Sequence, residues 1–153
     1  MAEKKIGSRE FKVGPMTAPD AYKLLCEMIA ITGSAAQYLP SMLSAAKKDD
    51  AEGSFLADVG AFAACSSMIK EVGVEGFLDF KRKVIESAMV KRPSGAYESV
   101  LFDSDFIGDL VSAEKLFEWV LEEQFAPFLK GSEVSGPVAL SIMLIRNVFR
   151  TLS

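Results

Sequence analysis

The 153-residue chain contains no histidine, and this absence excludes several kinds of chemistry. Ser-His and Cys-His nucleophilic pairs need an imidazole base, and imidazole nitrogen is a common zinc ligand. The two cysteines, Cys26 and Cys65, lie in apolar, helix-like stretches and lack the spacing of a metal-binding pair. We therefore expect two buried free thiols. A catalytic site in this chain would have to use carboxylates, lysine or tyrosine.

Long hydrophobic runs and a strong basic charge are also missing. No apolar run approaches the roughly 20 residues of a membrane-spanning helix, and the polar start, MAEKKIGSREF, is unlike a signal peptide. The net charge is −4, and the densest basic stretch, residues 81–92, is interrupted by Glu86. We interpret that stretch as a solvated helix face rather than a phosphate-binding stripe. These features predict a cytoplasmic protein that binds neither nucleic acid nor a membrane.

Apolar residues, in contrast, are abundant. They make up 50% of the chain, against 25% charged residues, which is typical of a globular protein. The length suits one domain covering residues 1–153. The mean hydropathy of +0.22 is high for a domain of this size. We therefore expect some apolar surface to be covered by a partner or by another copy in a homo-oligomer.

Hydrophobic periodicity predicts a mainly α fold with five to six helices. The clearest helix begins at Thr17, which can form a capping box with Asp20, and ends at Gly33. Pro40 should divide the segment that follows. The remaining predicted helices cover residues 34–48, 54–73, 74–90, 112–131 and 137–153.

The helix over 54–73 has an apolar face. It carries large side chains at helical spacing, namely Phe55, Val59, Phe62 and Ile69. The many small residues of the same segment favour close packing against a neighbouring element. Gly73 should end this helix.

A small amount of β-structure accompanies the helices. Residues 4–13 predict a β-hairpin, because Gly7 can adopt the positive φ that its two-residue Gly-Ser loop requires. Residues 97–102 are rich in Tyr, Val and Phe and predict a short strand. That strand could pair with the N-terminal hairpin.

Three aspartates fall within seven positions, at Asp103, Asp105 and Asp109. A calcium loop of the EF-hand type needs alternate ligands, a central glycine and a distal glutamate, and this stretch lacks that pattern. A helix-capping role is the favoured interpretation, with Asp103 or Ser104 opening a short helix and Asp109 or Ser112 opening the next. A metal-binding or catalytic role for the three carboxylates is the alternative.

The C-terminal segment, residues 132–153, predicts a helix that is apolar on nearly every side. It is interpreted as a core or subunit-interface helix, with partner docking as the alternative; its two arginines are too few for a convincing membrane-surface helix. The aromatic residues near 117–128 either fill the core or line a groove. The candidate partner-binding residues are Trp119, Phe125, Phe128, Ile142, Ile145 and Phe149.

Motifs of enzymes and cofactor-binding proteins do not occur. The sequence has no P-loop, dinucleotide fingerprint or nucleophile elbow. We therefore predict no catalytic residue, no cofactor and no metal site.

The chain resembles the tail assembly chaperones of long-tailed bacteriophages over roughly residues 4–131. The resemblance rests on a hairpin followed by a Pro-containing turn and a helix, on the next helix junction, and on an aspartate loop that leads into a Trp-containing helix. The corresponding stretches are IGSREFKVGPMTAPDAYKLL, ITGSAAQYLPSML and VLFDSDFIGDLVSAEKLFEWVLEEQFAPFLKG. Residues 132–153 lie outside the resemblance.

The resemblance implies a protein that is not an enzyme. Such chaperones bind the long helical tape-measure protein before the tail tube polymerises, keep it soluble and help to recruit tail tube subunits. They act in the host cytoplasm and are absent from the mature virion. The aspartate loop would then be architecture rather than a reaction centre. The alternative function is a helical adaptor or regulator of bacterial origin.

Overall fold

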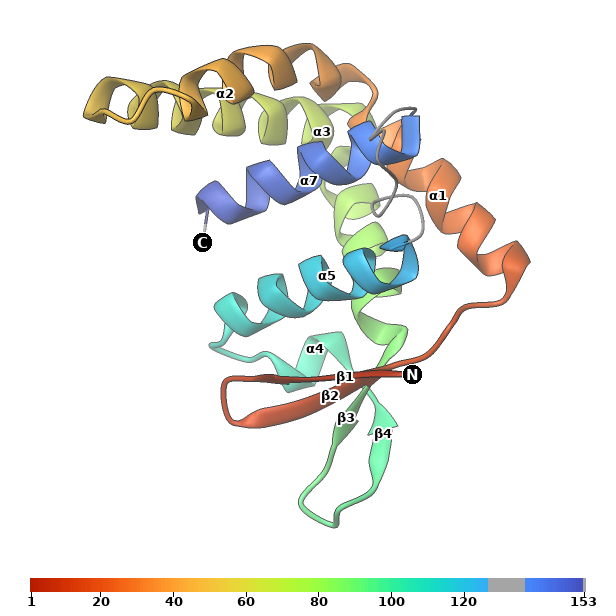
Figure 1. Cartoon of the computed structure of the whole chain (residues 1–153). Helices are drawn as coiled ribbons and strands as arrows, with labels where there is room; N and C mark the ends of the chain where they lie inside the picture. Colours follow the sequence, from red (N-terminus) through yellow and green to blue (C-terminus); the bar gives the residue numbers. More distant parts are fainter. Residues whose placement is uncertain (127–136, 153) are drawn as a thin grey trace.

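The computed structural model describes residues 1–126 and 137–152, apart from the side chains of Ala46, 137–139 and 149–152. The fold is mainly helical, as predicted, and it contains a small four-stranded sheet (Figure 1). The strands are β1 (Ala2–Ile6), β2 (Arg9–Val13), β3 (Ala88–Lys91) and β4 (Tyr97–Ser99). The helices are α1 (Ala18–Thr32), the 3₁₀ helix η1 (Ser34–Tyr38), α2 (Leu39–Ala46), α3 (Ala51–Glu86), α4 (Phe102–Asp105), α5 (Leu110–Gln124) and α7 (Pro137–Leu152).

The sheet is antiparallel throughout, with the order β1-β2-β3-β4. The predicted hairpin is confirmed: Gly7 has φ +60° in the turn, and Ile6 pairs with Arg9. Phe11 in β2 pairs with Val90 in β3, and Val90 pairs in turn with Glu98 in β4. The strand predicted near residue 97 therefore shares a sheet with the hairpin, but the two are joined through β3.

The helix predicted over 74–90 is too long, because it ends at Glu86 and the chain then forms β3. Ala88 and Val90 are buried, whereas Met89 and Lys91 are exposed, which is the two-residue alternation of a half-buried strand. Pairing with β2 on one side and β4 on the other stabilises this conformation. Tertiary hydrogen bonding here outweighs the helical pattern of the residues that precede it.

The ends of α1 agree only partly with the prediction. Thr17 caps the first turn, since its Oγ1 accepts a hydrogen bond from the Asp20 amide at 3.4 Å and donates to the Asp20 carboxylate at 2.7 Å. Gly33 has φ −55°, so the chain continues helically into η1 instead of stopping in a left-handed turn. Pro40 lies in the first turn of α2, and it divides this segment as predicted.

The longest helix, α3, is interrupted at Gly73. Its first residue follows Asp50, whose carboxylate accepts a hydrogen bond from the Gly53 amide at 2.6 Å. Gly73 has φ 74° and ψ 167°, a backbone conformation that residues other than glycine essentially never adopt. The predicted boundary at Gly73 is therefore confirmed as a break between two helical halves.

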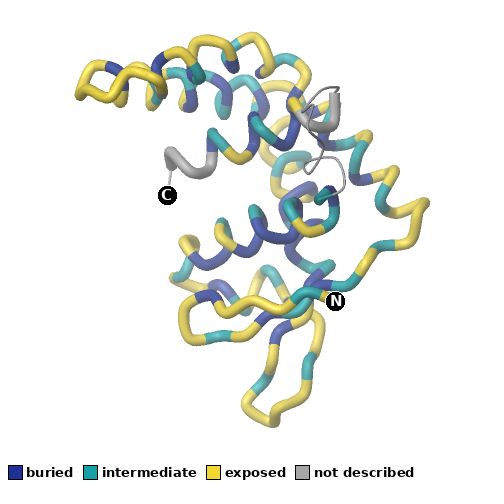
Figure 2. The backbone as a smooth tube through the Cα atoms, viewed as in Figure 1, coloured by how far each residue is buried: buried dark blue, intermediate teal, exposed yellow. Residues whose placement is uncertain are grey.

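The elements form successive layers. The pair made by α2 and the first half of α3 extends from the body of the molecule, with α7, α5 and the sheet lying one after another below it in Figure 1. Buried residues concentrate between these layers, and the tip of the α2–α3 pair is mostly exposed (Figure 2). One contiguous cluster joins sheet and helices, and its largest fully buried side chains are Phe11, Phe117, Met28, Met68, Ile85, Leu116 and Leu121.

The two cysteines lie nearer to the surface than predicted. Cys26 is exposed on α1, because Leu24 and Met28 take the buried side of that helix. Cys65 is half-buried, and desolvation raises the pKa of its thiol. Both thiols are free, but the expectation that both are buried is wrong.

Candidate functional site

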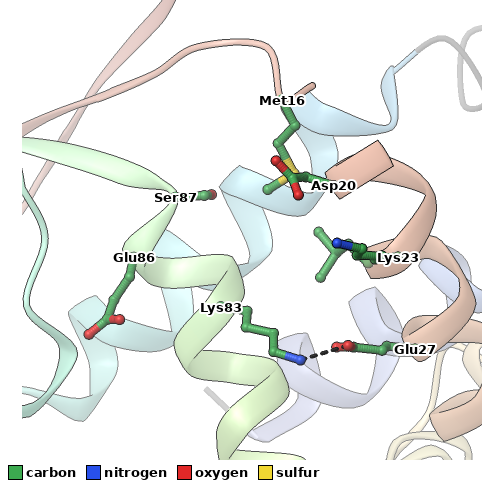
Figure 3. A pocket seen from close by; sticks show the side chains of 8 residues that line it. Met16, Asp20, Lys23, Glu27, Lys83, Glu86 and Ser87 are labelled. Carbon is green, nitrogen blue, oxygen red and sulfur yellow. Dashed lines mark hydrogen bonds and ion pairs between the residues drawn. The ribbon is translucent and has the colours of Figure 1, made fainter. Parts of the chain in front are cut away.

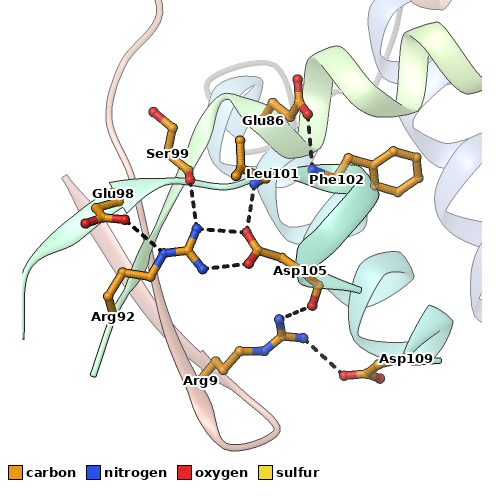
Figure 4. A network of polar contacts seen from close by, with 9 residues as sticks. All are labelled: Arg9, Glu86, Arg92, Glu98, Ser99, Leu101, Phe102, Asp105 and Asp109. Atoms are coloured by element: carbon orange, nitrogen blue, oxygen red, sulfur yellow. Dashed lines mark hydrogen bonds and ion pairs between the residues drawn. The ribbon is translucent and has the colours of Figure 1, made fainter. Parts of the chain in front are cut away.

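Each of the three aspartates pairs with an arginine: Asp103 with Arg82, and Asp105 and Asp109 within the network shown in Figure 4. Asp105, at the end of α4, receives two hydrogen bonds from the guanidinium of Arg92, at 2.6 and 3.0 Å. The amide of Leu101 donates to the same carboxylate at 2.7 Å. The Asp105 side chain is only 11% exposed, so this ion pair is largely shielded from water.

Asp109 is the N-cap of α5. Its carboxylate accepts a hydrogen bond from the Ser112 amide at 3.2 Å and contacts the guanidinium of Arg9 at 3.1 Å. Arg9 also donates to the backbone carbonyl of Asp105, which ties the hairpin to the aspartate stretch. Capping by Asp109 is confirmed. The short helix α4 instead follows Leu101, so the predicted caps Asp103 and Ser104 are wrong.

These contacts favour ionised carboxylates. Hydrogen bonds from Arg92, followed by the Leu101 amide and charge attraction, outweigh desolvation and lower the pKa of Asp105. Hydrogen bonds from Ser112, and more weakly the charge of Arg9, lower the pKa of Asp109. Across the described residues, no three carboxylate or thiol side chains gather in a way that could hold a metal ion. The stretch fastens the sheet to α4 and α5.

The basic stretch 81–92 is not simply a solvated face. Each of its five cations pairs with a carboxylate from another part of the chain. Lys81 is 8% exposed and pairs with Glu114 on α5, and Arg92 pairs with Asp105. The predicted solvated face is therefore wrong for Lys81, because packing of α5 on α3 encloses its ammonium group.

The first half of α3 presents large apolar side chains to solvent. Phe55 is 65% exposed, Val59 is 49% exposed and Phe62 is 71% exposed. With the half-buried Ser66 and Ile69 they form one face of the helix, which we call the α3 strip. The sequence predicted that these large residues share a face, and the structure turns that face outward.

Small residues on the opposite face explain this orientation. Gly53, Ala61 and Ala64 are buried on the side of α3 that packs against α2 and η1. A Cβ atom added at Gly60 would lie 2.7 Å from Cγ of Met42 on α2, so the helices approach too closely there for a larger residue. Close packing therefore uses the small-residue face, and the large side chains of the α3 strip stay outside.

A hollow adjoins the α3 strip. Its volume is about 300 Å³, and Tyr38 from the 3₁₀ helix η1 lines it. The other residues that line it are Phe62, Ala63, Ser66, Ser67 and Lys70. A strip of exposed large side chains beside a depression can accept an apolar helix or aromatic side chain.

A family model described as phage tail assembly chaperone protein, TAC, matches residues 7–136. The chain belongs to this family. The match includes the aspartate stretch and the α3 strip, and it ends immediately before α7. It confirms the resemblance that the sequence predicted. The comparisons with curated proteins and with solved structures each gave no match.

Family membership places this chaperone among assembly factors rather than among proteins defined by a reaction. Its expected partners are therefore tail proteins. In the part of the chain that the structure describes, no helix combines the length and the apolar character needed to cross a bilayer.

The predicted partner-binding residues lie mostly inside the chaperone. Trp119, Phe125, Ile142 and Ile145 are each at most 4% exposed, because α5 and α7 pack on one another and on α3. Phe128 and the side chain of Phe149 lie outside the described residues. A role in partner binding stays a prediction for these residues, and for the four buried ones it requires the elements that cover them to move.

Polar contacts hold α7 in place. The Thr32 hydroxyl on α1 donates to the Ser141 hydroxyl at 2.7 Å. Arg146 contacts the carboxylate of Glu122 on α5 at 3.5 Å. In the structure α7 is thus an integrated layer of the fold.

A cleft of about 400 Å³ separates α1 from the end of α3 (Figure 3). Met16 and Leu24 supply apolar surface, but charged side chains dominate its rim. An ion pair between Lys83 and Glu27, at 2.6 Å, spans the cleft between the two helices. This mixture of charges suits a purely apolar ligand less well than the α3 strip does.

Proposed function

We propose that this chaperone binds the tape-measure protein of its phage and keeps its apolar helical segments soluble before the tail tube forms. The α3 strip is the observation that supports this proposal. Three large apolar side chains remain about half or more exposed on one helix, although the fold has a separate and extensive core. Exposed apolar surface is costly in water and is typically a site of protein binding.

The geometry suits an amphipathic helix as the ligand. The side chains of the α3 strip follow the spacing of one helix face over residues 55–69, which span roughly 22 Å at the rise of an α-helix. A tape-measure helix with its own apolar stripe can lie along it, as in other helix-in-groove complexes. Phe55 and Phe62 would supply the largest contacts, and many small contacts of modest affinity along the α3 strip suit reversible binding better than a few very tight anchors.

Exchange of the chaperone for tail tube subunits requires reversible binding to the tape-measure protein. The chaperone would help to recruit tail tube subunits, which then replace it on the tape-measure protein. It would act in the host cytoplasm and would not remain in the mature virion. Movement of α7 would offer Trp119, Phe125, Ile142 and Ile145 as a second contact surface during this exchange.

Co-expression tests the tape-measure step. The tape-measure protein of the same genome is produced alone, with the chaperone, and with the Phe55→Asp/Phe62→Asp variant. We expect the chaperone to increase the soluble fraction and the variant to lose that effect, since charges on the α3 strip oppose docking of an apolar helix. An Ile107→Asp variant is the matched control, because Ile107 is 82% exposed elsewhere on the surface.

Unchanged insolubility of the tape-measure protein with the wild-type chain would refute the proposal. Equal protection by the wild type and the Phe55→Asp/Phe62→Asp variant would instead refute the assignment to the α3 strip. For the tube step, tagged chaperone bound to tape-measure protein should retain purified tube subunits, and chaperone alone should retain fewer. If the tape-measure protein does not increase the amount of tube subunit that the chaperone retains, the recruitment role is contradicted.

A further inference from the structure

The α3 strip has the spacing of a coiled-coil seam. Glu52, in the first turn of α3, extends the line of the α3 strip toward the start of the helix. The positions along this line are 52, 55, 59, 62, 66 and 69, so successive intervals are three, four, three, four and three residues. This heptad spacing places the side chains along one line that a second helix can follow. The opposite face of this half of α3 packs on α2 and η1, whereas Phe55, Val59 and Phe62 on the seam are exposed.

We propose that a second copy of this chain covers the α3 strip, with the two α3 helices antiparallel across a two-fold axis. In this register Val59 lies against Phe62 of the second copy, and Phe55 lies against Ser66. Every contact then occurs twice, as a two-fold interface requires. This dimer would form when no tape-measure protein is bound to the chaperone. It therefore does not depend on which protein the chaperone binds.

The shape of the surface supports this register. Phe55 projects from one end of the α3 strip and is 65% exposed. The hollow of about 300 Å³ lies at the other end, around Ser66 and between Tyr38 and Lys70. Antiparallel pairing brings the Phe55 ring of each copy to the hollow of the other. The small side chain of Ser66 leaves room there for the ring, as a hole receives a knob.

The charges at the two ends are also complementary. Glu52 lies at the beginning of the α3 strip and Lys70 lies at its end, on the same flank of the helix. Among the side chains that the structure describes, in residues 1–126 and 140–148, neither has an ion-pair partner. The antiparallel register places Glu52 of each copy beside Lys70 of the other. A parallel pair would instead bring like charges together at both ends.

The expected dimer is weak. Two helices in contact over about five turns bury less than the roughly 1,200 Å² that marks the low end of stable interfaces. We therefore expect a dissociation constant in the micromolar range or above. A dimer this weak lets a helix of the tape-measure protein compete for the same face.

Sedimentation equilibrium of the purified chain tests the interface. We expect a concentration-dependent mixture of monomer and dimer, and at least about a tenfold higher dissociation constant for Phe62→Asp. The Ile107→Asp control should dimerise like the wild type. Circular dichroism melts of all three proteins check folding, and since Phe62 is 71% exposed its variant should melt near the wild-type temperature.

A charge-reversal cycle tests the register. Glu52→Lys and Lys70→Glu should each raise the dissociation constant about threefold. This is the size expected when an exposed ion pair at the edge of the interface is lost from both of its two symmetry-related positions. The double variant should return to within about twofold of the wild type, because the pairs are restored with reversed sign. A structural effect of either single variant would persist in the double variant.

Three results would overturn the inference. A strict monomer up to millimolar concentration rejects the dimer, and a dimer that tolerates Phe62→Asp places the interface on another face. Failure of the double charge reversal to restore dimerisation rejects the antiparallel register. A monomer that still protects the tape-measure protein through the α3 strip would reject the dimer and leave the proposed function standing.

Discussion

Replacing Asp105 by Asn should destabilise the fold, although Asp105 belongs to a short surface helix. Its carboxylate accepts two hydrogen bonds from Arg92 and one from the Leu101 amide, and it is 11% exposed. Asparagine keeps the size of the side chain but removes its charge and one acceptor oxygen. The guanidinium of Arg92 then lacks its main counter-charge.

The magnitude follows from these contacts. A hydrogen bond to a charged group contributes about 1.5–3 kcal/mol. Because Arg92 is 23% exposed, water partly replaces the lost contact, and we expect Asp105→Asn to cost about 2 kcal/mol. For a chain of this length that corresponds to a melting temperature lower by roughly 4–8 °C. Asp103→Asn is the matched control, since Asp103 is 74% exposed in its pair with Arg82 and should change little.

The dependence on pH separates this explanation from a packing defect. The folded state lowers the pKa of Asp105, so the carboxylate contributes stability above its ordinary pKa near 3.9. That contribution is lost as the pH falls through the lowered pKa. Urea unfolding curves of wild type and Asp105→Asn should therefore differ at pH 7 and converge as the pH falls through that lowered pKa. A difference that persists unchanged in acid, or a variant as stable as Asp103→Asn, would refute the reasoning.

Three further substitutions test the backbone and the α7 contact, each measured by denaturant unfolding. Gly73→Ala should cost about 1–3 kcal/mol because φ is 74° there, and a neutral result would deny the break in α3. Gly53→Ala should cost about 1–3 kcal/mol, since a Cβ would lie 2.5 Å from Lys48 Cβ. Thr32→Val should cost about 1 kcal/mol by leaving Ser141 unpaired, and adding Ser141→Ala should recover part of it; no recovery would contradict that hydrogen bond.

Much of the fold could be predicted from local signals. The Gly7 turn, the Thr17 cap and the break at Gly73 each depend on neighbouring residues and on the conformations that glycine or a capping hydroxyl allow. The start of α7 at Pro137 was predicted for the same reason. Such signals act within one helical turn or one hairpin, so the sequence displays them directly.

Strand β3 and the surface residues could not be predicted in this way. Ala88–Lys91 continues a helical pattern, and it becomes a strand by pairing with β4 and with β2, which lies more than 70 residues earlier in the chain. Trp119 and Phe125 are aromatic residues typical of a binding surface, but packing of α5 and the residue after it among α3, α7 and β1 buries them. For Phe62, in contrast, the periodicity of the sequence predicts the correct helix face. Nothing in the sequence indicates that this face is exposed.

The sequence by itself determined which residues share a helix face, where most helices begin, and that the chain is related to the tail assembly chaperones. Tertiary structure alone decided which of two apolar faces of α3 enters the core. Both faces are apolar, so hydrophobicity does not distinguish them. The glycine and alanine face allows α2 to approach closely and gains more packing contacts, and the phenylalanines are therefore left on the outside.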